Sequence, residues 1–163
     1  VRAADDIIIK GGGHGAAAGV TLATERIDDF RRRVNEFYDS LQLKNQELYL
    51  LPRADVEVDD FSEINEELID NLAKMEPFGN GNAEPILKIT KATVLSVRRM
   101  GADGQHVKLT LRDKNDVALQ MLAFNAPEEF FREVGDEVSA WFQPTINEWQ
   151  GMRSVEGRLL HLA

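Results

Sequence analysis

The sequence contains no cysteine, so disulfides, thiolate zinc sites and cysteine nucleophiles are all excluded. No stretch approaches the roughly 20 consecutive apolar residues that cross a bilayer, and the first residues lack the basic and apolar pattern of a secretory signal. We therefore expect no membrane partner and a cytoplasmic location. Histidine chemistry is limited to His14, His106 and His161, which lie far apart without a metal-ligand spacing.

Positive charge is scarce for a nucleic-acid-binding protein, because the net charge is −9. Residues 1–85 hold 9 Lys and Arg against 18 Asp and Glu, a net charge of −9, whereas residues 86–163 hold 10 against 10 and are neutral. A neutral half can still present a basic groove locally. The total charge therefore lowers the expectation of a nucleic-acid partner without deciding it.

The first half carries helical periodicity. Apolar residues spaced three and four apart predict an amphipathic helix over 27–41. A second helix is predicted to begin at Ser62 as N-cap and to end before Pro77 and Gly79. Its buried stripe is expected to consist of Ile64, Leu68, Leu72 and Met75.

Period-two alternation replaces the helical pattern from residue 86 onward. It predicts strands over 86–100, 106–112, 117–125, 137–146 and 152–162, with a short helix over 127–134. Three strands, one helix and two further strands form the element order of a five-stranded OB-fold β-barrel. The sequence therefore predicts an α+β protein whose domain boundary lies in the turn-rich segment 77–85.

The most informative segment of the first half is the glycine cluster Gly11, Gly12 and Gly13, followed by His14. Missing side chains let backbone N–H groups approach a ligand closely, so a loop of this composition suits an anion. If residues 16–18 begin a short helix, its N-terminus adds a positive dipole end and His14 adds a side-chain donor. A tight structural turn is the alternative interpretation.

Five segments resemble parts of known families. Gly12, Gly13 and His14 followed by Ala17-Ala18-Gly19 resemble the signature of the DHHA1 domain of DHH/DHHA1 phosphoesterases. The run Pro77, Phe78, Gly79, Asn80, Gly81 and Asn82 resembles the linker that joins DHHA1 to the OB domain in RecJ exonucleases, with Ala83 where that family has proline. Residues 104–109, 123–125 and 147–151 are similar to the RecJ OB domain. Their common order is more specific than any one of them.

The resemblance implies the substrate-binding C-terminal portion of a 5'-to-3' single-stranded DNA exonuclease of recombination and repair. It implies the C-terminal part of a partial α/β DHHA1 domain over 1–60, a connecting helix and linker over 61–85, and an OB domain over 86–163. Single-stranded DNA, the missing N-terminal DHH domain of the same chain and repair proteins are the implied partners. The DHH domain is implied to hold the catalytic Mn or Mg, so this fragment is expected to bind no metal and to be inactive alone.

Two other functions stay open. The first is another DHH/DHHA1 phosphodiesterase acting on oligonucleotides or cyclic dinucleotides, although the additional barrel argues against it. The second is a non-catalytic OB-type module that binds nucleic acid or protein. The carboxylate pairs near residues 5, 28 and 59 are scattered at helix starts and turns, where acids are favoured for capping reasons, and the sequence has no Asp-His-His run. We therefore expect the catalytic metal ligands of a nuclease to lie in an N-terminal domain outside this chain.

Basic side chains on the second-half strands are the candidate DNA contacts. His106, Lys108 and Arg112 share one face of the strand 106–112, and Arg98 and Arg99 lie on the neighbouring strand. A solvent-facing strand surface without a ligand is the competing interpretation. With a net negative charge, the chain is expected to bind single-stranded DNA weakly and in a salt-dependent way.

Two aromatic residues, Phe124 and Trp149, are candidates for stacking on bases. Aromatic residues in strands lie more often in the core, so the sequence favours a core position for both. In the linker turn we expect a scaffold rather than a DNA contact, with glycines at positive φ and asparagines bonded to nearby backbone groups.

Overall fold

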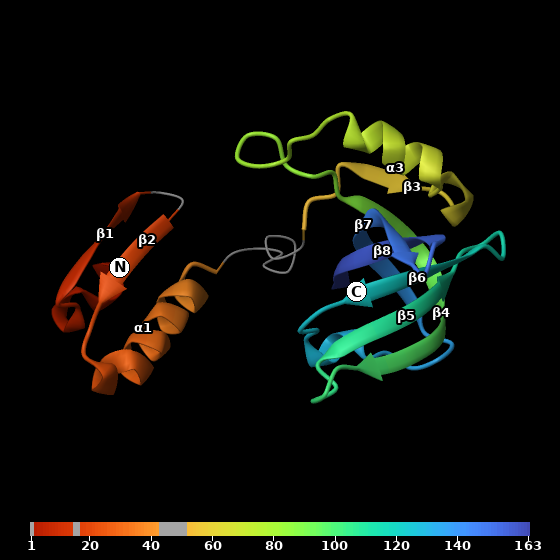
Figure 1. The fold of residues 1–163 in the computed structure, drawn as a ribbon. Coiled ribbons are helices and arrows are strands. Elements are labelled where there is room, and N and C mark those ends of the chain that lie inside the picture. Colours follow the sequence, from red (N-terminus) through yellow and green to blue (C-terminus); the bar gives the residue numbers. More distant parts are fainter. Residues whose placement is uncertain (1, 15–16, 43–51) are drawn as a thin grey trace. The chain divides into compact units, whose positions relative to one another are not determined.

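The computed structural model describes residues 2–14, 17–42 and 52–163 of the chain (Figure 1). It divides into two compact units, Val1–Leu50 and Leu51–Ala163. Helices and strands occur in both, so the protein is a mixed α+β protein with most of its strands in the second unit. None of the helices in the described ranges is long and apolar enough to span a membrane.

A β-hairpin and one helix make up most of the first unit. The hairpin consists of β1 (Lys10–His14) and β2 (Ala17–Thr21), which are antiparallel with Gly12 opposite Gly19. The glycine segment is therefore a strand rather than a loop, and Ala17 and Ala18 belong to a strand rather than to the short helix considered for residues 16–18. A β-carbon at Gly13 would overlap the backbone of Ala17 and Ala18, so glycine is required there by the close approach of the two strands.

Helix α1 (Ile27–Ser40) confirms the helix predicted from apolar periodicity. Two short 3₁₀ helices, Arg2–Ile7 and Thr24–Arg26, precede the hairpin and α1 respectively. The charged face of α1 is held by ion pairs one turn apart, among them Arg32 to Glu36 at 2.9 Å and Arg33 to Asp29 at 3.3 Å. Its apolar residues stay largely exposed, and Ala4 alone among the described residues of this unit is buried.

Five long strands form the body of the second unit. They are β4 (Leu87–Met100), β5 (His106–Arg112), β6 (Ala118–Ala123), β7 (Glu137–Trp149) and β8 (Met152–Leu162), and they agree closely with the predicted ranges. The sheet order is β3-β4-β5-β6-β8-β7, where β3 is the short edge strand Val56–Val58. An additional pairing of β4 with β7 joins the two ends of the five-strand order.

The long strand β4 changes partner along its length. Its first half pairs with β7 and its second half with β5, and the register shifts between Ile89 and Ala92 and again between Val94 and Ser96. Lys91, at φ 58°, lies at the first shift. Such bulges bend a strand and increase its twist, which lets one strand serve both edges of a curved sheet.

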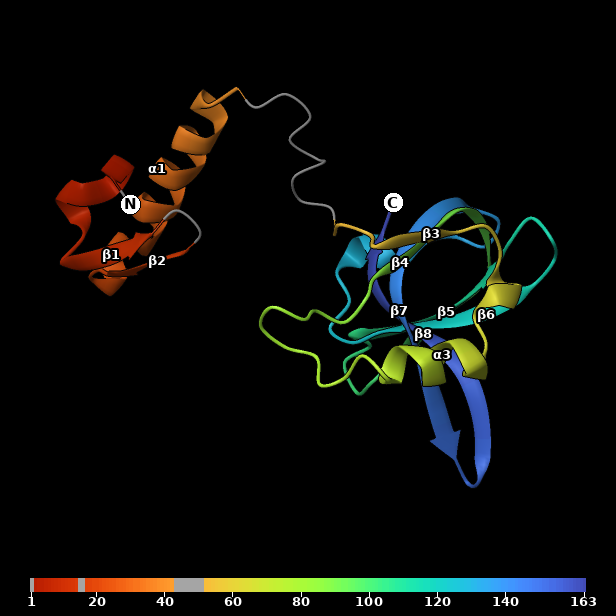
Figure 2. The same ribbon diagram turned by 90° about the horizontal axis from the view of Figure 1, so that it is seen from above.

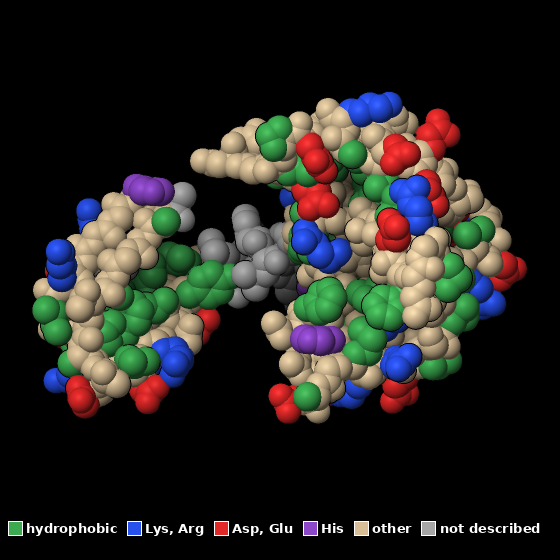
Figure 3. All heavy atoms as spheres, in the orientation of Figure 1, with side chains coloured by type: hydrophobic (Ala, Val, Ile, Leu, Met, Phe, Trp, Pro, Cys, Tyr) green, Lys and Arg blue, Asp and Glu red, His purple; other side chains and the backbone are tan. Residues whose placement is uncertain are grey.

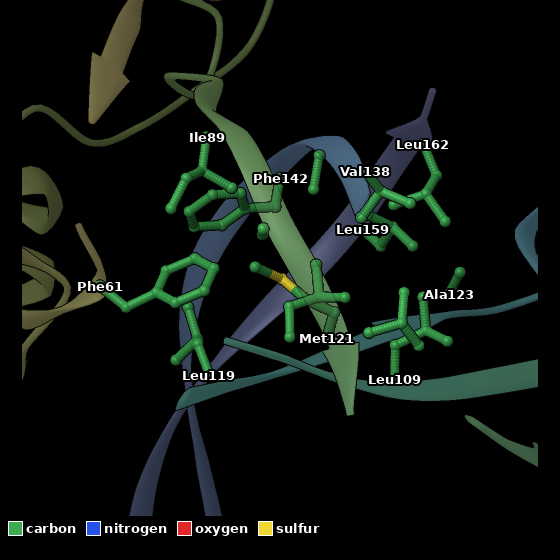
Figure 4. Close-up of a cluster of buried hydrophobic side chains, with 14 of the residues drawn as sticks. Phe61, Ile89, Leu109, Leu119, Met121, Ala123, Val138, Phe142, Leu159 and Leu162 are labelled. Atoms are coloured by element: carbon green, nitrogen blue, oxygen red, sulfur yellow. The ribbon is translucent and has the colours of Figure 1, made fainter. Parts of the chain in front are cut away.

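The core lies on the concave side of these strands. Figure 4 shows side chains from β4 to β8 converging there, with Phe61 entering from outside the sheet. Phe61 packs edge-on against Phe142 at 6.3 Å between ring centroids. The fully buried members include Ile89, Leu109, Leu111, Met121, Phe142 and Leu162, which alternate with outward-facing residues along their strands.

The connecting segment begins differently from our prediction. Asn65, not Ser62, caps helix α3 (Glu66–Ala73), because its side-chain oxygen accepts the Leu68 N–H at 2.9 Å. Ser62 lies in a 3₁₀ turn, Phe61–Glu63, capped by Asp60. The Ser62 hydroxyl and N–H, with Asn115 and Lys114, lower the pKa of the Asp60 carboxyl.

Two further local predictions can be compared with the structure. The helix expected over 127–134 is reduced to a single 3₁₀ turn, Glu128–Phe130. In the linker turn, Gly81 has the expected positive φ of 84° and the Asn82 amide donates to the carbonyls of Met75 and Pro77 at 2.8 and 3.0 Å. Gly79 does not have the expected positive φ, but its backbone exchanges two hydrogen bonds with that of Asn82. These bonds make the turn a hydrogen-bonded scaffold.

Candidate nucleic-acid interface

The outward face of β5 carries the predicted basic residues. His106, Lys108 and Arg112 are half-buried and alternate with buried Val107, Leu109 and Leu111. Arg98 of β4 lies directly opposite Lys108, so these two cations are neighbours on the same face. No ion pair engages Arg98 within the described part of the chain, which leaves its guanidinium available to a ligand.

The other two basic residues are engaged elsewhere. The Arg99 guanidinium lies 3.5 Å from the centre of the Phe131 ring and is bonded to Glu128. Arg112 pairs with Asp116 at 3.3 Å at the far end of β5. The structure therefore brings Arg98, His106 and Lys108 together, whereas Arg99 faces the opposite side of its strand and Arg112 lies at a distance along β5.

A groove next to these residues is the main hollow on this face. It has a volume of about 290 Å³ and is built chiefly by β6, β7 and β8. Figure 2 shows the β7–β8 hairpin projecting beyond the rest of the sheet beside this face. The lining residues are Glu84, Leu122, Phe124, Gln143, Thr145, Ile146, Asn147, Glu156, Gly157 and Arg158.

Charges within the groove are paired with one another. Lys108 Nζ lies 3.1 Å from Glu156, which is buried and also receives a longer bond of 3.5 Å from the Asn147 amide. Arg158 donates from Nε to Gln143 at 3.1 Å and pairs with Glu84 at 3.1 Å. A phosphate can reach Lys108 and Arg158 only by sharing them with these acceptors, so the groove has no strong positive field.

One end of the groove holds an exposed aromatic ring. Phe124 is 63% exposed and meets the His106 ring edge-on at 5.2 Å between centroids. The Asn125 backbone N–H donates to His106 Nδ1 at 3.0 Å, so the imidazole carries its proton on Nε2. This bond fixes the imidazole beside Phe124.

The tip of the β7–β8 hairpin exposes two more large apolar residues. Trp149 and Met152 are opposite each other in register and are 67% and 69% exposed. We expected Trp149 and Phe124 to lie in the core, and that expectation is wrong for both. Trp149 is the last residue of β7, where the final three residues are all exposed, and Phe124 follows the last residue of β6.

On this face of the second unit, Figure 3 shows hydrophobic side chains around a histidine, with basic and acidic side chains beside them. Such a mixture suits a chain of bases and phosphates better than a purely anionic ligand.

The glycine hairpin is a separate candidate site in the first unit. Gly12 and Gly19 are cross-strand partners, and a β-carbon at either would meet no atom within 4 Å. Lys10 and His14 lie on the same face of β1 as Gly12, because alternate strand residues share a face. The hairpin therefore presents a strip of bare backbone between two side chains that can donate hydrogen bonds to an anion.

Several groove residues were missed by sequence reasoning. Glu156 and Arg158 alternate along β8, and this pattern could have placed them on one face. Their position beside Lys108 depends on the parallel pairing of β6 with β8 and the antiparallel pairing of β7 with β8, which no local pattern encodes. Gln143 and Asn147 join the groove for the same reason.

Metal ligands do not gather in this structure. Across residues 2–14, 17–42 and 52–163, no group of three or more His, Asp or Glu side chains could hold a metal ion. The described residues therefore do not fit the two divalent ions of a metal-dependent nuclease.

Comparison with known proteins identifies the second unit. Residues 54–161 match the family described as the RecJ OB domain. The chain belongs to this family. The match to the RecJ OB domain covers β3, the connecting helix α3 and the five long strands, so it includes the groove and the linker turn.

The RecJ relatives extend the similarity to nearly the whole chain. The single-stranded-DNA-specific exonuclease RecJ of Bacillus subtilis is 33% identical over 152 residues, 93% of this chain and 19% of the relative. The Haemophilus influenzae RecJ is 27% identical over 153 residues, 93% of this chain and 26% of the relative. The chain thus spans about a fifth to a quarter of the length of these relatives.

A solved structure shares the fold. RecJ of Thermus thermophilus in complex with Mn²⁺ has a TM-score of 0.59 at 23% identity, and the match covers 99% of this chain and 23% of that one. The same protein was also solved with Mg²⁺. The likeness to these structures therefore supports the fold of the chain.

Proposed function

We propose that this chain is the substrate-binding C-terminal portion of a single-strand-specific DNA exonuclease that acts 5' to 3' in recombination and repair. The observation that carries the proposal is the groove built by β6, β7 and β8, with Arg98 and Lys108 beside it and Phe124 and Trp149 exposed around it. The RecJ relatives, which are single-stranded-DNA-specific exonucleases by name, support the same substrate.

The second unit is proposed to be a five-stranded OB barrel over residues 86–163. The cycle of pairings β4-β5-β6-β8-β7-β4 and the parallel β6–β8 pair support it. OB folds bind oligonucleotides on the face of their second and third strands, between the loop after the first strand and the loop before the last. Here these strands are β5 and β6, and the second loop is the tip that carries Trp149 and Met152.

The first unit is proposed to be the end of a DHHA1 domain, with residues 1–60 in that domain and residues 61–85 connecting it to the barrel. Its bare hairpin strip at Gly12 and Gly19, flanked by Lys10 and His14, is proposed to contact phosphate or sugar of the substrate. At an open strand edge, backbone N–H groups can come close to an anion where side chains are missing, and this role does not need a helix at residues 16–18.

Catalysis is proposed to belong to a DHH domain elsewhere in the parent protein, which would hold Mn or Mg. This chain contributes strand binding and orientation, and we expect no turnover from it alone. Its cytoplasmic location and its association with repair proteins are part of the same proposal. Nuclease activity of the purified 163-residue chain with Mn would overturn this division of roles.

The groove is proposed to hold bases more than phosphates. Base–aromatic stacking on Phe124 and Trp149 is worth about 1–3 kcal/mol per base, and it tolerates any sequence. Arg98 and Lys108 supply two phosphate contacts, which predict a slope of log affinity against log salt of about −1.4. Binding by the isolated chain is therefore expected to be weak.

The experiment is fluorescence anisotropy with a labelled oligothymidine. Phe124→Ala and Trp149→Ala should each weaken binding about 5- to 100-fold, and Arg98→Gln should reduce the salt slope by about 0.7. Val134→Ser, an exposed apolar residue outside the groove, is the matched control. Equal affinity of all four proteins for the oligonucleotide would overturn the assignment of this face.

The hairpin is tested in the complete parent enzyme. His14→Ala should lower exonuclease activity at nearly unchanged stability if the strip contacts the substrate. Loss of stability with retained specific activity would instead favour a structural turn, because Gly13 already shows that close strand approach is one function of this segment.

A further inference from the structure

A second groove lies in the same unit and adjoins the first at the linker, where Glu84 lines the first groove and Ala83 and Pro85 line the second. It is formed between the edge strand β3 and the helix α3 and has a volume of about 420 Å³. Leu68 and Leu72 of α3 form one wall, and Val56 and Val58 of β3 contribute to the other. Volumes of this size are typical of binding clefts, which occupy roughly 300–1,000 Å³.

Its apolar walls are left uncovered. Val56 is 52% exposed and Met75 is 49% exposed, and both line the groove. Contiguous exposed apolar surface with a polar rim is typical of an interaction site, and an exposed methionine adapts to partners of different shape. In the described structure β3 pairs with β4 alone, so the other edge of β3 has no strand partner.

The rim is acidic. Residues 55–76 contain nine Asp and Glu against the single cation Lys74. Asp55 and Glu63 line the groove directly, and no Lys or Arg does so among the described residues. Three of the nine are paired, since Glu57 lies 3.6 Å from Lys88, Asp59 3.6 Å from Lys114 and Glu66 2.9 Å from Arg153. Within the described ranges Glu63, Glu67 and Asp70 make no ion pair.

We propose that this groove is a docking site for a basic peptide segment of a partner protein that inserts one or two apolar side chains between β3 and α3. Charge complementarity selects this occupant, because Lys or Arg flanking the apolar anchors would meet the unpaired carboxylates of the rim. Nucleic acid is disfavoured, since its phosphates would face the same carboxylates. A second copy of the chain is disfavoured too, because it would bring two acidic rims together.

This inference goes beyond the proposed DNA-binding function, because it uses a different surface and a ligand of opposite charge. One chain would hold a nucleic acid on the β5–β6–β8 face and a cationic protein segment at the β3–α3 groove. The two activities are therefore separable by mutation.

The test uses the complete chain and a synthetic, fluorescein-labelled peptide of alternating Leu-Lys-Lys repeats. A second peptide with Glu in place of every Lys is the ligand control. Anisotropy titrations should give a Kd of about 10–300 µM for the basic peptide and binding at least about tenfold weaker for the acidic one. Equal binding of the two peptides, or no binding of the basic peptide, overturns the proposal.

Two substitutions locate the binding. Glu63→Lys should weaken binding of the basic peptide about fivefold, and Glu133→Lys, the same charge change outside the groove, should have an effect below about twofold. Met75→Ser should weaken binding about threefold, with exposed Val134→Ser as its control. Effects of equal size in groove and control variants would overturn the location.

The other occupants give distinct results. If Glu63→Lys strengthens oligothymidine binding more than Glu133→Lys does, or if Met75→Ser abolishes a concentration-dependent dimer seen by sedimentation, the partner assignment is wrong. Glu63→Lys and Met75→Ser should leave oligothymidine affinity within about twofold, so failure of the DNA proposal and failure of this one are distinguishable.

Discussion

At the residue scale, Gly157 links the groove of the second unit to the hydrophobic core beneath it. Gly157 of β8 lines the groove from outside, yet a β-carbon there would overlap the Met121 sulfur and lie 3.1 Å from the Phe142 ring. Both of those residues are fully buried. The absence of a side chain at Gly157 therefore lets Met121 and Phe142 pack directly against the backbone of β8, between Glu156 and Arg158.

Replacing Gly157 with Ala tests this role. Overpacking of a close-packed core typically costs about 1–3 kcal/mol, so Gly157→Ala should lower the free energy of unfolding by that amount in urea denaturation. Gly79→Ala is the matched control, because a β-carbon at Gly79 meets nothing within 4 Å and its φ is not positive. Equal stability of the two variants would contradict the close contact.

His161 gives the fold a pH dependence. Burial lowers the pKa of this imidazole below its ordinary value of 6.5, Arg132 adds to the lowering and Glu129 opposes it. The ring packs edge-on against Trp141 at 5.2 Å between centroids. Because the pKa of His161 is lower in the folded chain than in the unfolded chain, the unfolded chain binds more protons between these two pKa values. The stability that depends on a neutral His161 is therefore fully present above about pH 6.5 and is lost as the pH falls toward the folded pKa.

The measurement is the urea midpoint between about pH 7.5 and about pH 5, compared with His161→Gln. The wild-type midpoint should fall more steeply than that of the variant, by an amount corresponding to at most one extra proton. Parallel profiles would show that His161 titrates alike in the folded and unfolded chain.

At the scale of elements, the connecting segment is fastened to the sheet by one carboxylate. Asp113, at the end of β5, is buried and accepts the Phe61 N–H at 2.6 Å on Oδ2. Its Oδ1 accepts the N–H groups of Asn115 and Val117 at 2.8 and 3.0 Å. The same residue thus shapes the β5–β6 turn and holds Phe61 against the core.

Asp113→Ala should be among the most destabilising substitutions in the chain. It leaves three backbone donors without an acceptor, and we expect a loss of about 2–4 kcal/mol in the free energy of unfolding by urea denaturation. Asp103→Ala, an exposed aspartate of the β4–β5 turn, should change stability by less than about 0.5 kcal/mol. A comparable effect at both positions would refute the anchoring role of Asp113.

At the scale of the whole molecule, the two units differ in how much they bury. The second unit contains the extended hydrophobic core, whereas the described part of the first unit buries only Ala4 and exposes Ile27 and Phe37 of α1 and Leu41 directly after it. A hairpin with one helix has too few layers to exclude water from an apolar face. The first unit therefore needs further protein surface for stability.

Truncation tests this difference. Residues 52–163 alone should unfold cooperatively, with a urea midpoint close to that of the main transition of the complete chain. A peptide of residues 2–42 should show no cooperative transition, with helical circular dichroism below that of α1 in the structure. A cooperative transition in this peptide would mean that its exposed apolar face is stable in water.

Much of the fold was predictable because its signals are local. The strands from β4 to β8 and the helix α1 were predicted within a few residues, since apolar periodicity depends only on neighbouring positions. Helix starts were less reliable. Ser62 and Asn65 are both good caps, and the Phe61 contact with Asp113 selects Asn65 by holding the preceding turn against the sheet.

The candidate site was predicted only in part, because its parts come from strands that are distant in sequence. Arg98, His106 and Lys108 share a face through the simple β4–β5 hairpin, which sequence can suggest. The pairing of Arg99 with Glu128 and Phe131 could not be foreseen, nor could the burial of Glu156 beside Lys108. The glycine segment was misjudged as a loop because glycine composition does not distinguish a turn from a closely paired strand.

The sequence by itself determined the secondary structure of the second half, the uneven distribution of charge and the resemblance to RecJ, because these are carried by residue order and composition. Only the tertiary structure decided which charges neutralise one another, which aromatic rings reach solvent and where the two grooves lie. Those properties depend on strand pairing across long separations, such as β4 with β7 and β6 with β8, and on the contacts that such pairing imposes.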